Sequence, residues 1–349
     1  MNRLVRAALM LAAALLVAAR AFACPVCVVG PGLSPAQQLM NADRVLLIAA
    51  ERAEWKTIEV IKGPLADVPP GELPPGSGTV VALRDPMSKW LVLGSLPPAE
   101  VPWLKQVVVG RSTLEMSDAD WRARVRFHLP YLEHAVPLIA ETAYSEVARA
   151  PYAAMRAARS QLDAARLQRW LDDPALASRR SLYTLLLGIV GGQTATQRIE
   201  RQLTAAEREQ DFSELAALLV ADMELRGPPS VVSIEKRYLA QRGPLTRDLQ
   251  AALLTLSEQG QADAAVPRAR VVEAYRAFIR SEHPLAGFVA PDFQRWRDWS
   301  AVADYAALIR SGAWQQPASI YAMYGYLSSA PGPEARAAAA AIKQRPAQP

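Results

Sequence analysis

The sequence predicts an α+β protein of two domains, a small antiparallel β-barrel or sandwich followed by a larger domain of α-helices. Two observations predict this order. Short apolar or alternating stretches, joined by loops rich in proline and glycine, occupy the first part of the chain. From residue 117 onward nearly every segment has the apolar spacing of an amphipathic helix, and only short breaks separate these segments.

Residues 1–23 have the features of a secretory signal peptide. Arg3 and Arg6 precede an apolar run, and Ala21 and Ala23 occupy the positions that signal peptidase recognises. The run is too short to cross a bilayer as a helix, and no later stretch is long and apolar enough to do so. We therefore expect export to the periplasm, the cell envelope or the medium, and no transmembrane segment.

The composition bears on the choice of partner. Removal of residues 1–23 takes away three arginines, so the formal net charge falls from +5 to +2. A value so close to zero provides no electrostatic basis for binding nucleic acid or an anionic membrane. The hydrophobic fraction of 51% is sufficient for buried cores, and three histidines are few for a metalloenzyme. We expect a protein partner and no cofactor.

The first domain is expected over residues 24–116. Ser34 has the character of a helix N-cap, and Pro35 suits the first position of the short helix that follows. A loop is expected over residues 67–78, where proline and glycine are concentrated. The predicted strands cover residues 45–50, 55–61, 79–83, 90–93 and 106–109.

The second domain is expected over residues 117–343, with a helix start at Ser117 and a disordered tail over 344–349. Short helices with tight connections can form a bundle or a solenoid, and the size of a helix pair favours a HEAT-like solenoid with degenerate repeats. The predicted helices cover residues 120–133, 137–149, 163–171, 180–190, 194–203, 212–223, 231–239, 246–257, 268–280, 299–310, 318–327 and a segment after Pro333.

The stretch from Pro35 to Val45, with Gln37-Gln38 and Asn41-Ala42-Asp43, resembles the opening of netrin-like domains, a group that includes tissue inhibitors of metalloproteinases. The segment 57–64, which contains Lys62-Gly63, resembles the strand of that family that ends in Lys-Gly. The resemblance covers about residues 24–64. It implies a small OB-like antiparallel β-barrel of five strands ahead of the HEAT-like solenoid.

This sequence departs from the inhibitors at their functional end. Those proteins begin Cys-x-Cys and join these cysteines to distant partners, whereas this chain has Cys24 and Cys27 and no other cysteine. Met40 stands where the family has a cysteine before Asn-Ala-Asp. The disulfide frame that shapes the inhibitory wedge is therefore absent, and protease inhibition is the weakest of the functions considered.

The whole chain also resembles a set of secreted bacterial proteins of planctomycete type that combine a Cys-Pro-x-Cys opening, a netrin-like domain and a HEAT-like domain. The stretches 132–144, 150–152 and 295–300 carry this resemblance. It implies the architecture and export, and it brings no known activity.

Cys24 and Cys27 are the strongest chemical candidates. In an exported chain two thiols three residues apart form a local disulfide, a redox pair or part of a site for a soft metal ion. The disulfide is favoured, because Val28-Val29-Gly30 follows where a redox motif has a helix. A lipid anchor on Cys24 is a further alternative, although Ala21 stands where lipoprotein signals have leucine.

Other catalytic patterns are missing from the sequence. His128 and His134 are six residues apart, which places them on different helix faces, and His134 and His283 lie at expected helix ends, where a capping role is favoured. There is no Gly-x-Ser-x-Gly elbow and no phosphate-binding loop signature. We expect neither catalytic nor metal-binding residues among these groups.

The densest aromatic cluster lies near the C-terminus. Helical spacing of these aromatic residues is typical of a core between helices, and core packing is favoured. The alternative is a protein-binding patch of Arg295, Trp296, Arg297 and Trp299, because Trp and Arg are enriched in interface hot spots. The cluster comprises Phe293, Trp296, Trp299, Tyr305, Trp314, Tyr321, Tyr324 and Tyr326.

Together these observations favour an exported, non-enzymatic binding or scaffold protein of the cell envelope with an unidentified protein partner. Thiol–disulfide exchange or metal handling by Cys24 and Cys27 is the alternative.

Overall fold

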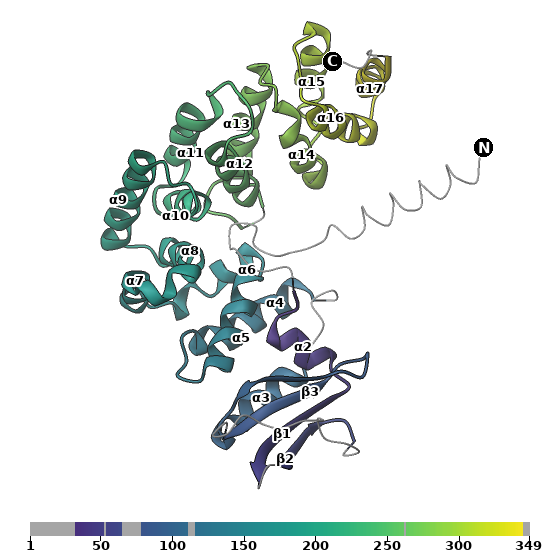
Figure 1. Cartoon of the computed structure of the whole chain (residues 1–349). Helices are drawn as coiled ribbons and strands as arrows, with labels where there is room; N and C mark the ends of the chain where they lie inside the picture. Colours follow the sequence, from purple (N-terminus) through teal and green to yellow (C-terminus); the bar gives the residue numbers. More distant parts are fainter. Residues whose placement is uncertain (1–31, 52–53, 65–77, 111–115, 262, 345–349) are drawn as a thin grey trace, which may run out of the picture. The chain divides into compact units, whose positions relative to one another are not determined.

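The computed structural model describes residues 32–51, 54–64, 78–110, 116–261 and 263–344. The chain divides into two compact units, residues 1–158 (unit 1) and 159–349 (unit 2). Figure 1 shows that the described part of unit 1 combines a β-sheet with helices, and that of unit 2 consists of helices. The predicted α+β class is therefore confirmed.

In the described part of unit 1 the sheet has four antiparallel strands in the order β2-β1-β3-β4. The central strand β1 is buried on both faces. Val45 and Leu47 on one face pack with α2, α3 and α5, and Leu46 and Ile48 on the other pack with β3 and the edge strands. The strands are β1 (Arg44–Glu51), β2 (Glu54–Lys62), β3 (Thr79–Arg84) and β4 (Trp90–Ser95).

The expected closed barrel is wrong for the described residues. The sheet is open, because β2 and β4 lie at its two edges and do not pair with each other. The fifth strand expected over residues 106–109 belongs instead to helix α3 (Val101–Val108) and its C-cap. Apolar side chains at residues 101, 104 and 108 recur with helical spacing and are buried against the sheet, so this periodicity outweighs the β propensity of three consecutive valines.

The helix starts predicted in unit 1 are confirmed. Ser34 caps α2 (Pro35–Asn41) by accepting a hydrogen bond from the Gln37 N–H, and Pro35 fills the first helical position. Ser117 caps α4 (Asp118–His128) in the same way, with Asp120 completing the capping box. Two further α-helices of unit 1 among the described residues are α5 (Pro137–Ala148) and α6 (Tyr152–Ala157).

The compact unit extends beyond the boundary expected from the sequence. Secondary structure changes from strands to helices near residue 100, and the division between the units falls after Ala158 rather than at residue 116. The reason is packing: α5 contacts α2 and β4, and α4 contacts α5 and α6. The predicted signal peptide, most of the predicted loop over 67–78 and the tail after Gln344 lie outside the described residues.

A buried ion pair joins three helices of unit 1. Glu146 of α5 has 1% of its surface exposed, and its carboxylate pairs with the Arg124 guanidinium of α4. The hydroxyl of Ser34, the N-cap of α2, donates a hydrogen bond to the same carboxylate. The chain just before this cap is also held, because Arg149 Nη2 donates to the Gly32 carbonyl at 2.7 Å. A buried charge persists where such partners satisfy it.

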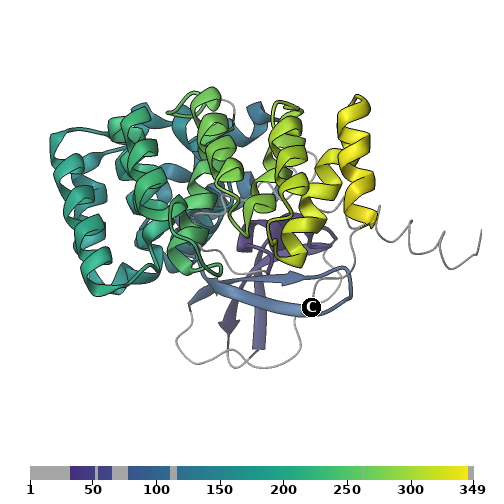
Figure 2. The same cartoon turned by 90° about the horizontal axis from the view of Figure 1, so that it is seen from above.

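Unit 2 is a two-layer array of helices. Contacts join α8, α10 and α12 in series and α14 to α16, while α11, α13, α15 and α17 pack in series as the second layer. Figures 1 and 2 show this succession. The helices are α7 (Ala164–Asp172), α8 (Arg180–Val190), α9 (Gln193–Glu209), α10 (Leu215–Arg226), α11 (Pro228–Ile234), α12 (Arg247–Gln259), α13 (Arg268–Arg280), α14 (Ala290–Trp296), α15 (Val302–Ser311), α16 (Pro317–Ser329) and α17 (Pro333–Gln344).

One apolar core runs along most of this array, from Ile199 of α9 to Ala339 of α17. Most of the predicted helices of unit 2 are confirmed, and those over residues 180–190 and 268–280 have the predicted bounds. Helix α14, whose second residue is Pro291, was not predicted. The helix predicted over residues 231–239 is present as the second half of α11 and a π-helical turn, Glu235–Leu239.

Two helical glycines provide a test of the packing. A Cβ on Gly188 of α8 would lie 2.5 Å from the Ala221 Cα of α10, so Gly188→Ala has to separate these helices. We expect a loss of about 1–3 kcal/mol in unfolding free energy, measured by urea denaturation. Gly325→Ala is the control, because a Cβ there has ordinary contacts, and we expect a gain of about 0.5–1 kcal/mol from helix propensity. Equal effects at both positions would contradict the close packing of α8 and α10.

A second test concerns the buried ion pair of unit 1. Glu146→Gln leaves the Arg124 charge without its buried partner, and we expect about 3 kcal/mol of lost unfolding free energy. Lys105→Gln removes an exposed partner of Glu59, which lies 2.5 Å away, and we expect about 0–1 kcal/mol. Chemical denaturation of both variants makes the comparison. If the two losses were equal, Glu146 would not anchor unit 1.

Candidate functional site

The structure separates the residues predicted to form a protein-binding patch. Arg295 and Trp296 end α14, Arg297 is the C-cap in the left-handed conformation (φ 54°), and Trp299 lies in the turn before α15. Arg295 and Arg297 are exposed, whereas the two tryptophans are partly buried and pack against the core of unit 2. Cys24 and Cys27, the other predicted site, lie outside the described residues.

Trp296 is held among three neighbours. Its ring stacks on Tyr275 of α13 with centroids 6.0 Å apart and 10° between the planes. The Arg268 guanidinium lies 5.4 Å from the indole centroid. A Cβ on Gly260 would come within 2.0 Å of the indole, so the backbone after α12 approaches the ring closely. Trp296 therefore closes the junction of α12, α13 and α14, a role that the core interpretation predicted.

The rest of the aromatic cluster divides in the same manner. Phe293, Tyr305 and Tyr326 have no measurable exposed surface, and Trp299 packs on Tyr326 with centroids 5.4 Å apart. Trp314 and Tyr321, by contrast, are 50% and 77% exposed. The sequence spacing alone could not separate these two groups, because residue type and spacing do not show which side chains the folded array covers.

A buried carboxylate lies beneath Arg295. Asp292 of α14 accepts hydrogen bonds from the Tyr275 hydroxyl at 2.7 Å and from the Ser257 hydroxyl at 2.9 Å. Arg295 Nη2 lies 2.5 Å from Asp292 Oδ1 and also donates to Ser257 Oγ at 2.9 Å. Asp292 thus joins α12, α13 and α14. We call Ser257, Glu258, Tyr275, Asp292 and Arg295 the junction cluster.

The electrostatics of the junction cluster follow from burial. Burial raises the pKa of Tyr275 well above its usual value, and the Asp292 charge adds to the effect. Burial also raises the pKa of Asp292, against the opposing influence of Arg295 and of the two hydroxyl donors. The half-exposed Arg295, with 49% of its side chain accessible, is the cation that compensates this carboxylate.

Glu258 is the most unusual group of the cluster. It lies next to Ser257 with 8% of its surface exposed, and burial together with the nearby Asp292 charge raises its pKa to about 7, although Arg295 opposes the shift. Between pH 4.5 and about 7 the folded protein therefore keeps a proton on Glu258 that the unfolded chain, with its ordinary pKa of 4.5, has lost. The protonated Glu258 makes its full contribution to the free energy of unfolding below pH 4.5, and this contribution is lost as the pH rises through about 7.

Sequence analysis did not identify Ser257, Glu258, Tyr275 or Asp292. Arg295 was singled out because it flanks a tryptophan, and only the i, i+3 spacing from Asp292 could have indicated an ion pair. Ser257 is 35 residues from Asp292 along the chain. No local pattern predicts a contact over such a distance.

The three histidines lie apart from one another, and their local surroundings explain the properties of each. Burial, with the nearby Arg124 charge, lowers the pKa of His128 to about 3. His134 Nδ1 accepts a hydrogen bond from the Val136 N–H, so it acts at the start of α5 instead of capping carbonyls. His283 Nδ1 accepts from the Leu285 N–H, and its Nε2 lies 2.8 Å from the Gln241 carbonyl oxygen. Burial lowers the pKa of His283, because the charged form loses its hydration.

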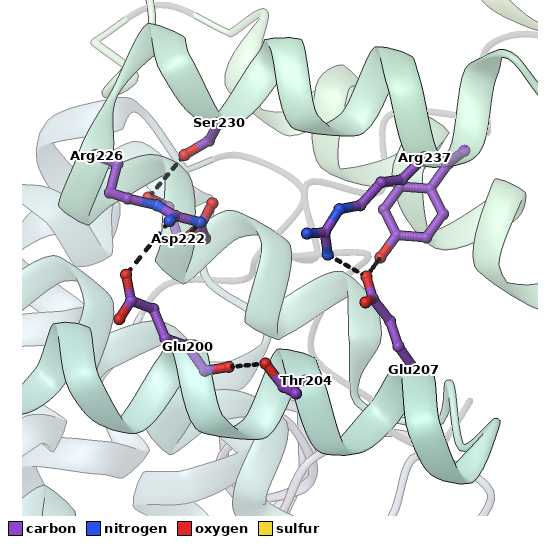
Figure 3. Close-up of polar contacts among 8 residues, drawn as sticks. Glu200, Thr204, Glu207, Asp222, Arg226, Ser230 and Arg237 are labelled. Carbon is purple, nitrogen blue, oxygen red and sulfur yellow. Dashed lines mark hydrogen bonds and ion pairs between the residues drawn. The ribbon is translucent and has the colours of Figure 1, made fainter.

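Each unit also has a hollowed surface. Helix α9 borders one, and Figure 3 shows how its carboxylates are paired: Glu200 with Arg226 at 3.4 Å, and Glu207 with Arg237 and the Tyr238 hydroxyl. Each of these two glutamates is thus paired with an arginine from another segment of the array.

An open hollow of about 520 Å³ lies along the surface of α9 itself and is lined by Gln197, Glu200, Arg201, Thr204, Ala205 and Arg208. A groove of about 290 Å³ in unit 1 is lined by Gln106, Val107, Val109, Gly110, Met116, Asp120, Ala123, Arg124, Phe127 and His128.

Comparisons of the chain with protein-family models, with curated proteins and with solved structures found no match. In the described ranges no helix combines the length and apolar character needed to cross a membrane. The same residues contain no group of three or more His, Cys, Asp or Glu placed to hold a metal ion.

The hydrogen bond from Tyr275 to Asp292 can be tested by removing one oxygen. Tyr275→Phe keeps the ring that stacks on Trp296 and removes the donor to a buried carboxylate, so we expect a loss of about 1–3 kcal/mol in unfolding free energy. Tyr321→Phe is the control, because that side chain is 77% exposed, and we expect no measurable change. Urea denaturation at neutral pH compares them, and an unchanged Tyr275→Phe would exclude a stabilising bond at Asp292.

Proposed function

We propose that the chain is an exported, non-enzymatic binding or scaffold protein of the cell envelope, and that unit 2 is a HEAT-like solenoid supplying the binding surface. The observation that carries this proposal is the two-layer array, in which helices contact their near neighbours in sequence. Such arrays present a long continuous surface to partners. The netrin-like origin of unit 1 remains a prediction from the sequence.

Within this array the junction of α12, α13 and α14 is the proposed contact region. Arg295 and Arg297 are exposed there. The end of α14 that carries them is held in place, because Trp296 and Asp292 both contact Tyr275 of α13. Arginine, like tryptophan and tyrosine, is enriched in interface hot spots. Trp296 itself is engaged with Tyr275 and Gly260, so we assign it to the support and the two arginines to the contact.

The near-neutral charge of the predicted mature chain agrees with a protein partner. In unit 2 several charges are also paired between helices, as at Glu207 and Arg237 and at Arg276 and Asp304. We therefore expect a partner to recognise the surface of unit 2 by its shape and by a few specific contacts, and not by a strong electrostatic potential of one sign.

Site-specific photo-crosslinking in intact cells tests the proposal. A photoreactive residue replaces Arg297, and the control replaces Glu273 of α13, whose side chain is 71% exposed. We expect one discrete adduct from position 297 that is absent from position 273, because a specific partner covers the first site and not the second. The adduct is identified by mass spectrometry.

Two results would count against the proposal. Absence of an adduct from position 297 in producing cells would remove the proposed contact region. Equal, diffuse labelling at both positions would show that the surface meets other proteins only at random.

The alternative role for Cys24 and Cys27 in thiol exchange or metal handling stays a prediction. No contact of the described residues favours it over a local disulfide.

A further inference from the structure

The outer edge of β4 (Trp90–Ser95) is an open edge of the sheet in unit 1. No described strand pairs with it, because β3 pairs with the other side of β4. An edge strand presents backbone N–H and C=O groups that can pair with a further strand. The side chains are open as well: Leu91 is 43% exposed and Val92 49%, and Met87 in the turn before β4 is 72% exposed.

The two edges of the sheet differ in charge. Lys56, Glu59 and Lys62 lie along β2, and charged side chains on an edge strand hinder its pairing with another chain. The sequence of β4 is Trp-Leu-Val-Leu-Gly-Ser, which contains no charged residue. The edge at β4 therefore lacks the charges that protect the edge at β2, and its chemistry fits an uncharged strand.

The pairing with β3 shows which side chains of β4 share a face. Trp90 packs against the apolar cluster that contains Ala82, and Val92 lies on the same face because it pairs with Ala82. Leu91 lies on the opposite face, where its partner Leu83 packs with the helices of unit 1. The register against β3 shifts after Val92. The regular part of β4 thus runs from Trp90 to Val92, with Leu91 at its centre.

We propose that β4 pairs with β4 of a second copy of this chain, in antiparallel order and with Leu91 on the twofold axis. Such a dimer uses the same surface on both copies. Trp90 then lies opposite Val92 of the second copy, and the symmetry forms this pair twice. An aromatic side chain opposite a β-branched one is a favourable cross-strand pair. Lys89, just before β4, faces Leu93 of the second copy, whereas a parallel pair in register would bring the two lysines together.

The dimer would join the two sheets into one continuous sheet through β4. A single pair of strands is a small contact, so we expect a weak dimer that dissociates in the micromolar range. The inference concerns unit 1 and does not depend on the binding surface proposed for unit 2.

Sedimentation equilibrium of the natural full chain tests the pairing. A reducing agent is present, so that Cys24 and Cys27 cannot link two copies. Between about 1 and about 100 µM we expect the weight-average mass to rise from that of one chain toward that of two. A mass of one chain over the whole range would overturn the proposal, and it is also the result expected if a segment of a different protein covers β4.

A charge exchange at Leu91 tests the register. In the proposed dimer the two side chains at this position lie opposite each other, so Leu91→Lys and Leu91→Glu each bring like charges together. For either variant alone we expect the dissociation constant to rise by about tenfold or more. An equimolar mixture of the two should recover the dimer, because lysine then faces glutamate. Ile58→Lys on β2, at a side chain 46% exposed, is the control and should associate as the natural protein does.

Recovery of the dimer in the mixture would also show that both variants fold. If either variant alone associates as tightly as the natural protein, or if the mixture stays monomeric, β4 does not pair with its own copy about Leu91 and the proposal is wrong. Should a Leu91 variant fail to fold, Val92→Lys takes its place, because it removes the pair with Trp90 at a side chain that is 49% exposed. An unchanged dissociation constant for that variant would reject the pairing.

Discussion

A carboxylate buried among helices has to be met by donors from its neighbours, and each unit of this protein is organised around one. Glu146 accepts from Ser34 of the α2 cap and from Arg124 of α4, while Asp292 accepts from α12, α13 and α14. Apolar side chains supply most of the stabilisation, because the hydrophobic effect depends on area. It has no direction, whereas these two carboxylates add directional contacts among the helices that they join.

The buried carboxylates of the two units differ in how their charges are compensated. Glu146 has an arginine and a hydroxyl to itself, and its charge is satisfied. In unit 2 Asp292 pairs with Arg295, which is half-exposed, and it also accepts hydrogen bonds from Ser257 and Tyr275. An array whose helices contact only near neighbours can yield at one junction without disturbing distant ones.

Much of the fold could be predicted from local patterns, because caps, prolines and apolar periodicity are local. The features predicted in this way include the N-caps at Ser34 and Ser117 and the presence of most helices in unit 2. The strand expected over residues 106–109 failed because the valines were considered apart from the apolar residues that precede them. The barrel failed with it, since closure had been inferred from a family resemblance and a fifth strand.

The candidate site was only partly predictable. Arg295 and Trp296 could be singled out because arginine and tryptophan are typical of interfaces and the two are adjacent in the sequence. The residues around them, Ser257, Tyr275 and Asp292, come from three helices and meet only when the array is folded. Burial of Glu258 likewise depends on neighbours far along the chain, so the sequence could not distinguish it from the exposed glutamates of other helices.

The N-terminal anchor of unit 1 has a mechanical consequence. The chain is held at Gly32 by Arg149, the C-cap of α5, and at Ser34 by Glu146 of α5, and this helix also packs against β4. A pull on the segment before residue 32 is therefore applied to α5 and the sheet at once, instead of peeling α2 away turn by turn. Unit 1 would resist such a load as a block, with the tension passing through side chains at the start of the fold.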